Sequence, residues 1–429
     1  MDCQPHRSCN QAETSLIVMR SFSAFLFAVL IAASRSTSWA SVTIPLRKLE
    51  FTGSYLQGSP HADRARAASF LETTSGPETI PATSMGYQYT VRVGVGSPAT
   101  YYDLLVDTGS SNTFVGTGKK YVRTSTSVPT GQNVTVTYGT GTGFFSGIEY
   151  NDTVTLAPGF AIKNQSIGDA LNSSTFEGVD GLIGLGPADL TEHTLTPDTG
   201  LIPTVMDNAL KQGLIKNQIF GISFAPAPTL PDTNGVITYG GIDPAWYIGD
   251  ITYTPITKTS QSSGYWGINV TQATYGAHTV IPQSTAGIVD SGTNLVRLAD
   301  DFFSRYLEAI PGAYVDVNKT GLIVIPLISV GTMQPLNFTI NGRVFTMDAA
   351  AQLLPMREHL NPGGARYGVI NKAGANSGSG FDFILGLKFM ERYYVVFDAD
   401  NSRVGFAYTN HTFTRNTPVA ERELRITGE

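Results

Sequence analysis

The chain has 429 residues, roughly two or three times the length of an ordinary domain, which predicts at least two packed units. About 41% of its residues are hydrophobic, only 14% are charged and 45 are glycine; this composition excludes a disordered chain and favours a β-rich one. The formal net charge of −6 argues against a nucleic-acid-binding protein, which needs basic patches.

The N-terminus carries a short apolar run at residues 22–33, FSAFLFAVLIAA, just after Arg20. The run is too short for a membrane span, which needs about 20 residues, and is typical of a secretion signal. Ser38-Trp39-Ala40 offers a cleavage site, so we predict a signal peptide over residues 1–40, with Met19 as a second candidate initiator. A buried helix or a signal anchor is the alternative. Both cysteines, Cys3 and Cys9, fall in this segment, so neither can cross-link the mature fold.

Acceptor triplets for N-linked glycans also favour export. The sequence has eight Asn-x-Ser/Thr triplets, at Asn133, Asn151, Asn164, Asn172, Asn269, Asn318, Asn337 and Asn410. The C-terminus is polar and has no hydrophobic anchor signal. We therefore predict a secreted, extracellular glycoprotein without a stable membrane anchor.

Residues 41–75 differ in charge from the chain that follows. Through Glu72 the sequence has seven Lys or Arg and five Asp or Glu, which leaves a net charge of −8 for the remainder. A basic leader on an acidic body predicts a removable pro-segment held partly by charge. An exposed linker is the alternative.

From Tyr87 onward, short alternating runs are separated by Gly, Asn and Pro, which indicates β-strands. One run places four apolar residues on a single face, as a half-buried strand requires: Tyr89, Val91, Val93 and Val95. Helical spacing occurs at 201–215 and at 299–310, and the second segment opens with acidic residues suited to a helix N-terminus. The chain is therefore predicted to be mainly β with a few short helices.

Two apolar-framed motifs occur in the same order in each half of the chain. LLVDTGSSN (104–112) is followed by VDGLIGLG (179–186), and GIVDSGTNL (287–295) is followed by FDFILGLKF (381–389). One motif alone would be weak evidence, but chance would have to place the same ordered pair twice. The pattern indicates an internal duplication.

The repeated Asp-Thr/Ser-Gly triplets carry the chemistry. Asp107 and Asp290 each follow three apolar residues, and a buried Asp is costly unless it is compensated. The glycine permits a tight turn that directs backbone N–H groups at the carboxylate, while Thr108 and Ser291 could hydrogen-bond across to the opposite loop. If a pseudo-twofold axis relates the halves, the carboxylates meet, share a proton and activate a water between them. This arrangement hydrolyses amides under acid conditions without a metal.

Other readings of these residues are weaker. A single Asp-Thr-Gly is usually a turn with a satisfied side chain, but two copies in matched frames make that interpretation poor. Paired carboxylates also serve glycosidases, which do not need duplicated glycine-flanked loops. No histidine cluster has metal-ligand spacing, since the candidates are scattered at His193, His278, His359 and His411. There is no G-x-S-x-G sequence of a serine hydrolase.

The segment VTVTYGTGTGFFSG (134–147) predicts a mobile hairpin, because an alternating strand leads into a glycine-rich tip and a return strand. Tyr138 would lie near the tip, and Gly139 and Thr140 would offer backbone groups to an extended peptide. An ordinary hairpin turn is the alternative.

These motifs together resemble the pepsin-like aspartic endopeptidases, most closely the secreted fungal polyporopepsin type. The resemblance runs from about Tyr87 to Tyr408 and includes VDTGSSN, YGTGTG, FEGVDGLIGLG, GGIDP, YWGINV, IVDSGT and FILG…YYVVFD…RVGFA in family order. It implies a mainly β, bilobal fold with a cleft between an N-terminal lobe at 76–255 and a C-terminal lobe at 256–429.

The resemblance also implies roles for individual residues. Asp107 and Asp290 would be the catalytic pair, with Gly109, Ser110, Gly292 and Thr293 supporting their carboxylates. Thr108 and Ser291 would form a hydroxyl grip between the lobes. Tyr138 would be the tyrosine of the flap, with Gly139 and Thr140 beside it contacting substrate.

As a member of this family the chain would be made as a zymogen and would cleave polypeptides. It would bind statine-type inhibitors, need no metal or organic cofactor, bind no nucleic acid and act as a monomer. In the precursor, Arg47, Lys48 or another basic residue of the pro-segment would occupy the anionic cleft. A non-catalytic binding protein of the same fold is the alternative from a different class, although both aspartates and the flap tyrosine are present.

Three positions depart from the usual family pattern. Phe114 stands where a tryptophan is usual, so we expect Tyr138 to be held by packing or water and not by an indole N–H. Leu387 stands where many members have Asp, which is expected to alter the pH optimum. Thr140 stands where some fungal members have an acidic residue that accepts Lys, so we expect a preference for apolar residues at P1.

Overall fold

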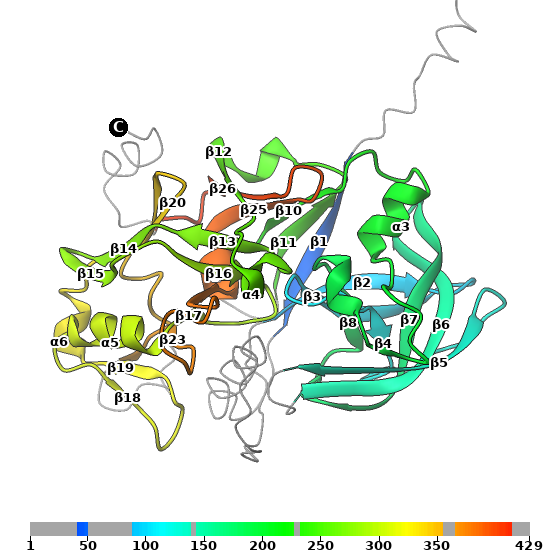
Figure 1. Cartoon of the computed structure of the whole chain (residues 1–429), viewed down its shortest axis with the longest axis horizontal. Helices are drawn as coiled ribbons and strands as arrows, with labels where there is room; N and C mark the ends of the chain where they lie inside the picture. The colour runs from blue at the N-terminus through cyan, green and yellow to red at the C-terminus, as the bar shows by residue number, and fades with distance from the viewer. Residues whose placement is uncertain (1–40, 50–87, 139–142, 227–231, 355–364, 414–429) are drawn as a thin grey trace, which may run out of the picture. The chain divides into compact units, whose positions relative to one another are not determined.

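The structure is a computed structural model that describes residues 41–49, 88–138, 143–226, 232–354 and 365–413 (Figure 1). Residues 41–429 form one compact unit. The predicted signal peptide at 1–40, and the part of the predicted pro-segment after residue 49, lie outside the described residues.

A long sheet of 14 strands runs through this unit, in the order β12-β26-β25-β10-β11-β1-β2-β3-β8-β4-β7-β6-β5-β9. Its strands are β1 (Val42–Leu49), β2 (Gln88–Val95), β3 (Thr100–Asp107), β4 (Phe114–Val115), β5 (Val128–Tyr138), β6 (Gly143–Ala157), β7 (Phe160–Ser174), β8 (Gly181–Gly184), β9 (Leu195–Thr196), β10 (Ile219–Ser223), β11 (Asp232–Tyr239), β12 (Ile248–Pro255), β25 (Tyr393–Asp398) and β26 (Arg403–Tyr408).

Three smaller sheets lie in the later part of the chain. Their strands are β13 (Gly267–Val270), β16 (Thr285–Val289), β24 (Phe383–Leu385), β17 (Val296–Leu298) and β23 (Ile370–Lys372); β15 (His278–Ile281), β14 (Gln272–Tyr275), β20 (Leu336–Ile340) and β21 (Arg343–Met347); and β18 (Tyr314–Val315), β19 (Ile323–Ile325) and β22 (Arg366–Tyr367).

Helices are short and few beside these strands: α3 (Val205–Lys211), α4 (Ser260–Ser263), α5 (Asp300–Glu308), α6 (Leu327–Val330), α7 (Leu387–Met390), and the 3₁₀ turns η1 (Ala188–Thr191) and η2 (Pro244–Trp246). The prediction of a mainly β chain is confirmed. So is the apolar face of β2, because Tyr89, Val91, Val93 and Val95 are all buried in the core.

Both predicted helices are present but are shorter than their apolar patterns. α3 begins after Thr204, whose hydroxyl accepts from the Asp207 N–H while the Asp207 carboxylate accepts from the Thr204 N–H. This capping box fixes the helix start inside the predicted 201–215 segment. α5 lies within 299–310; it begins with Asp300 and Asp301 and buries Phe302, Phe303 and Tyr306.

The internal duplication is visible in the strand pairing. In the first half, β3 runs parallel to β8, β8 is antiparallel to β4, and β4 is parallel to β7. In the second half, β16 runs parallel to β24, β24 is antiparallel to β17, and β17 is parallel to β23. The two motif copies therefore build the same four-strand arrangement twice.

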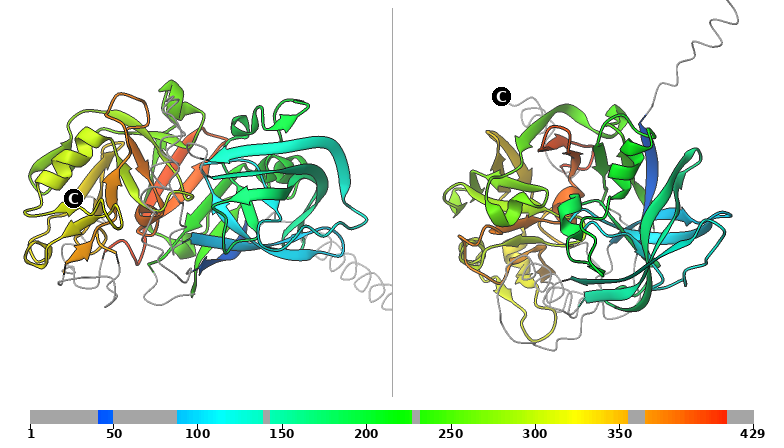
Figure 2. Two further views of the ribbon diagram at one scale, coloured as in Figure 1. Left: turned by 90° about the horizontal axis from the view of Figure 1, so that it is seen from below. Right: turned by 45° about the vertical axis from the view of Figure 1, so that its right-hand side comes forward.

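The long sheet joins segments that are far apart in sequence. β25, near the C-terminus, pairs with β10 through Phe220 and Phe397, and β26 pairs with β12. The two views of Figure 2 show these orange and red strands beside the green ones. Strands from the end of the chain thus complete a sheet that the first half begins.

Residues 42–49 of the predicted pro-segment form a strand inside this sheet. β1 lies between β11 and β2, with Ile44 opposite Ile237 and Arg47 opposite Thr90. Ile44 and Leu46 are buried in the core. The alternative of an exposed linker is therefore wrong for this stretch.

One buried carboxylate holds the surface loop that precedes β5. Asp152 accepts hydrogen bonds from the hydroxyls of Tyr121 at 2.5 Å, Thr126 at 2.5 Å and Ser127 at 2.6 Å, and from the Thr153 N–H at 2.7 Å. Desolvation by burial raises the pKa of Asp152, but these donors outweigh it and hold the pKa below its usual value.

We expect Asp152→Asn to lower the free energy of unfolding by roughly 2 kcal/mol at pH 5, because charge-assisted hydrogen bonds are lost. A lowered folded-state pKa contributes stability above the unfolded-state pKa, and this contribution is lost as pH falls through the folded-state pKa. Urea unfolding of the two proteins from pH 5 to pH 2 should therefore show their difference shrinking toward low pH. A difference that stays constant across this range would contradict the prediction.

Candidate active site

The first Asp-Thr-Gly triplet forms a loop at the end of β3. The Asp107 side chain is fully buried. Its Oδ1 accepts a hydrogen bond from the Gly109 N–H at 2.9 Å, and its Oδ2 accepts one from the Ser110 hydroxyl at 2.5 Å. The glycine and hydroxyl positions of the motif therefore supply the donors that a buried carboxylate needs.

The second triplet follows β16 and repeats this geometry. Asp290 is also fully buried. Its Oδ1 accepts from the Gly292 N–H at 2.9 Å, and its Oδ2 accepts from the Thr293 hydroxyl at 2.5 Å. The two carboxylates thus have equivalent donors at equivalent atoms.

Reciprocal hydrogen bonds bring the two loops together although they are 183 positions apart. The Thr108 N–H donates to Ser291 Oγ, and the Ser291 N–H donates to Thr108 Oγ1, both at 3.0 Å. Each hydroxyl in turn donates to the chain before the opposite aspartate: Thr108 to the Val289 carbonyl and Ser291 to the Val106 carbonyl. Exchanging the halves leaves the pattern unchanged, as a pseudo-twofold axis requires.

The glycines of the downstream motifs explain why each half has an apolar pair followed by Gly. A Cβ atom at Gly184 would overlap the backbone of Ser111, and one at Gly386 would overlap the carbonyls of Thr293 and Leu295. Each glycine lets a second strand pack directly behind an aspartate loop. The four motifs are therefore parts of one structure.

Ser291→Ala is expected to lower the free energy of unfolding by roughly 2 kcal/mol, because the buried Thr108 N–H and Val106 carbonyl lose their partner. Thr108→Val should cost a similar amount. Because the hydroxyls belong to one network, the double variant should lose less than the sum of the singles. Chemical denaturation of the four proteins measures this; strict additivity would contradict it.

The hairpin predicted to act as the flap is formed by β5 and β6. Tyr138 is the last residue of β5 and pairs with Gly143, the first of β6. The predicted hairpin at 134–147 is therefore present, although Gly139 and Thr140 lie outside the described residues.

Aromatic rings pack around Tyr138 at the end of this hairpin. The Tyr138 ring meets Phe176 edge to face, with centroids 5.4 Å apart and planes at 76°. Phe114, which stands at the usual tryptophan position, makes an edge contact of 5.1 Å with the same Phe176 and stacks on Phe145. The packing expected around Tyr138 is present, with Phe176 as its ring partner.

Comparison with known proteins adds independent findings. The model of a family described as eukaryotic aspartyl protease matches residues 88–409. Polyporopepsin from Irpex lacteus is 50% identical over 338 residues, which cover 78% of this chain and 98% of that protein.

The chain belongs to the eukaryotic aspartyl protease family.

More distant relatives and a solved structure agree with this assignment. Pepsin A from Sus scrofa is 28% identical over 339 residues, covering 75% of this chain and 81% of its own. The crystal structure of an aspartic proteinase from Irpex lacteus is similar, with a TM-score of 0.75 and 43% identity, and the match covers 87% of this chain and 99% of the other. The predictions of a pepsin-like fold and of an aspartic-type endopeptidase are therefore confirmed.

Two further findings concern the described part of this aspartic protease. No helix in it is long and apolar enough to cross a membrane. Among the same residues, no three His, Cys, Asp or Glu side chains are grouped so that they could hold a metal ion. Of the four candidate histidines named above, His193 contacts Asp198 at the surface and His359 lies outside the described residues.

The departure at Leu387 places a buried apolar side chain directly behind the Asp290 loop. The Leu387 N–H donates to the Thr293 carbonyl at 2.7 Å, and the Lys388 N–H donates to the Asn294 carbonyl at 3.0 Å. α7 is thus tied to the loop through its first two residues. The pH optimum expected from this departure stays a prediction.

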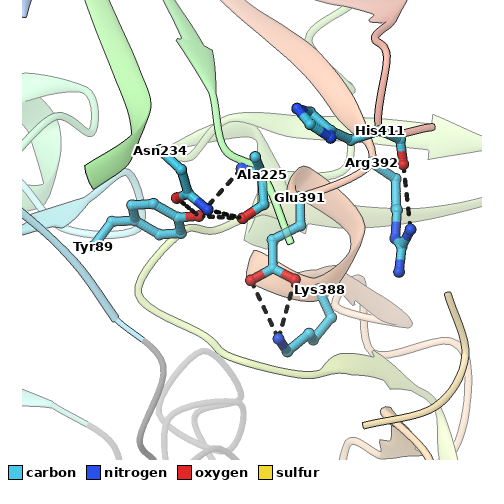
Figure 3. Close-up of polar contacts among 7 residues, drawn as sticks. All are labelled: Tyr89, Ala225, Asn234, Lys388, Glu391, Arg392 and His411. Carbon is cyan, nitrogen blue, oxygen red and sulfur yellow. Dashed lines mark hydrogen bonds and ion pairs between the residues drawn. The ribbon is translucent and has the colours of Figure 1, made fainter. Parts of the chain in front are cut away.

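Lys388 of α7 and Glu391, the residue that follows this helix, form a buried ion pair, with 3.0 Å between Nζ and Oε2 (Figure 3). Both side chains are buried, at 5% and 3% exposure. Sequence reasoning missed this pair. Opposite charges three residues apart inside the apolar segment FILGLKFMER were the available signal.

Trp266 connects the two halves beneath the aspartate loops. Its indole N–H donates to the Leu185 carbonyl at 2.9 Å, while the Leu185 N–H donates to the Asp107 carbonyl. The Trp266 carbonyl accepts from the Val289 N–H. A cavity of about 250 Å³ lies beside Leu185 and Trp266, and neither aspartate lines it. Sequence reasoning used YWGINV only as part of the resemblance and gave Trp266 no role.

Proposed function

We propose that this endopeptidase is secreted as a zymogen and hydrolyses peptide bonds at acidic pH through Asp107 and Asp290. The observation that carries the proposal is the matched, reciprocal hydrogen bonding around the two aspartates. It holds two buried carboxylates in equivalent loops that contact each other. That is the arrangement in which a single proton and a single water are shared.

The chemistry follows from the donors around each carboxylate. Gly109 and Ser110 hold the orientation of Asp107, and Gly292 and Thr293 hold that of Asp290. One carboxylate takes a proton from the water while the water oxygen attacks the carbonyl carbon of the scissile bond. The other, protonated carboxyl group donates its proton to the carbonyl oxygen. Proton transfer to the peptide nitrogen then lets the C–N bond break. This division of labour is general for aspartic proteases.

The flap supports peptide binding in this proposal. Tyr138 ends β5, and an extended substrate would form strand-like hydrogen bonds with the hairpin. With Thr140 beside Tyr138, no acidic side chain on the flap favours Lys at P1, so apolar residues are preferred around the scissile bond. Statine-type inhibitors would occupy the same site, and the enzyme would act as a monomer.

In this proposal the basic leader keeps the precursor inactive. Residues 1–40 would be removed as a signal peptide and residues 41–75 as a pro-segment, leaving lobes at 76–255 and 256–429. The structure does not support Arg47 as the cation in the cleft, because its side chain is exposed on β1. We propose that another basic residue of the leader occupies the cleft, and that protonation of acidic groups at low pH weakens this contact.

The asparagines of the eight predicted glycosylation triplets differ in solvent exposure. Asn133, Asn164, Asn172, Asn269, Asn318 and Asn410 are exposed, whereas Asn151 and Asn337 are half-buried. The Asn337 side-chain oxygen also accepts a hydrogen bond from Thr346 at 2.7 Å. Glycans are therefore proposed at the exposed positions and not at Asn337.

The proposal is tested by producing the full chain in a secreting host and incubating the purified product at pH 3 and at pH 7 with denatured casein. Casein should be cleaved at pH 3 only, together with loss of the leader, and a statine-type inhibitor should stop cleavage. N-terminal sequencing gives the mature start. Retention inside the host would overturn secretion. Casein cleavage before the leader is lost would contradict the proposal that the chain is made as a zymogen. Casein cleavage that the statine-type inhibitor does not stop would contradict the use of the aspartate pair.

A further inference from the structure

The turn that joins β7 to β8 presents an aromatic side chain to the flap. Thr175 has a positive φ of 69°, Gly178 has one of 87°, and the Val179 N–H donates to the Phe176 carbonyl at 3.3 Å. Non-glycine residues adopt a positive φ only where their surroundings hold them there. Phe176 is therefore carried by a turn of defined shape, and its side chain is 8% exposed.

This turn touches the hairpin at two places, both at its last described pair, Tyr138 and Gly143. Phe176 meets Tyr138 edge to face, which is a favourable aromatic geometry. A Cβ atom at Gly143 would lie 2.7 Å from the Thr175 hydroxyl, so the turn packs against the first residue of β6 as closely as a glycine allows. Both strands of the hairpin thus contact this turn: β5 packs against Phe176 and β6 packs against Thr175.

Phe176 also connects the flap to the strand behind the first aspartate. Its ring makes an edge contact with Phe114 at 5.1 Å and 81°. Phe114 begins β4, which pairs with β8 next to the Asp107 loop. The contacts run from Tyr138 through Phe176 to Phe114.

We propose that Phe176 is a positioning residue, which fixes the orientation of the Tyr138 ring in place of the missing indole. The proposal rests on the proposed function in so far as Tyr138 acts on substrate, but the contact itself can be tested without activity. Phe176 acts through Tyr138 and is not itself a catalytic residue.

The test compares Phe176→Leu with a matched control, Phe160→Leu. Phe160 lies at the opposite end of the β6–β7 ladder and also meets a tyrosine edge to face, Tyr239, with centroids 5.8 Å apart at 72°. Both changes remove one ring from a buried edge contact. Only the first touches the flap, so the control accounts for the general cost of losing such a ring.

Acid-activated enzyme and a fluorogenic peptide give the kinetic measurement. We expect Phe176→Leu to raise KM about threefold to tenfold with little change in kcat, because ordering the flap must then accompany binding. Phe160→Leu should leave KM unchanged. In a Tyr138→Ala background, Phe176→Leu should have no further effect on KM. An equal effect of Phe176→Leu in both backgrounds would overturn the proposal.

Hydrogen exchange followed by mass spectrometry supplies a readout that needs no activity. Peptides covering residues 134–146 should exchange faster in Phe176→Leu than in wild type, and at the wild-type rate in Phe160→Leu. A wild-type chain that did not cleave peptides would contradict the proposed function. The exchange measurement would still test the role of Phe176 in that case. Unchanged exchange in Phe176→Leu would overturn that role.

Discussion

Replacing either Asp107 or Asp290 by Asn is expected to lower kcat for peptide hydrolysis by at least about 10³-fold, with KM changed much less. An amide cannot take a proton from the water, so general-base catalysis is lost. The side chain keeps its shape, and its remaining oxygen can still accept one of the two hydrogen bonds made to each carboxylate. The loss should therefore fall on the chemical step.

The double variant should be hardly less active than either single one, because the two groups act as a unit. Asp250→Asn is the control, since this carboxylate is exposed on β12. Inhibitor binding, followed by calorimetry, would show that each variant is folded. Retention of a tenth of wild-type kcat by Asp107→Asn or Asp290→Asn would contradict the assignment.

A second large effect is expected from Glu149, a buried carboxyl group on β6. Its Oε1 accepts a hydrogen bond from the Ser166 hydroxyl at 2.5 Å, and its Oε2 has no hydrogen-bond partner among the described residues. Burial raises the pKa of Glu149 to about 7, and the Ser166 hydrogen bond opposes this only in part. The group is therefore neutral in the folded protein at acidic pH.

A raised folded-state pKa means that the folded protein binds more protons than the unfolded chain between pH 4.5 and about 7, so stability falls as pH rises through this window. The loss from Glu149 alone should reach roughly 3 kcal/mol above pH 7. Glu149→Gln imitates the neutral form. We expect it to match wild type at pH 4 and to be more stable by roughly that amount at pH 7.5.

Urea unfolding at half-unit steps from pH 4 to pH 8 measures this difference. Glu177→Gln, at an exposed glutamate, should follow the wild-type curve throughout. A Glu149→Gln curve parallel to wild type over the whole range would contradict the prediction.

The geometry of the two aspartate loops was easier to predict from the sequence than the packing around them. The Asp-Thr/Ser-Gly triplets, their hydroxyl neighbours and the downstream Gly184 and Gly386 could be predicted because a buried carboxylate loop restricts each position to few residue types. Short-range patterns of this kind can be recognised in a single sequence. The same holds for α5, whose acidic start and apolar spacing are local.

Features that depend on distant contacts were not predicted. Nothing near Phe176 shows that it meets Tyr138, because the contact is created by the path of the β7–β8 turn. Glu149 stands in an alternating strand where a solvent-facing residue is usual, and only the packing of the folded chain buries it. The pairing of β1 with β11 likewise joins segments that no local pattern relates.

The order of strands in the long sheet has a consequence for how the chain folds during synthesis. β2, β10 and β11 leave the ribosome long before β25 and β26, so β10 lacks one neighbour until almost the whole chain has been made. Unpaired strand edges invite association with other chains, and distant pairings form slowly. β1 is made before β2 and β11, so it is available to fill the place between them when they appear. Chains lacking residues 41–49 should therefore aggregate more readily while they are being translated.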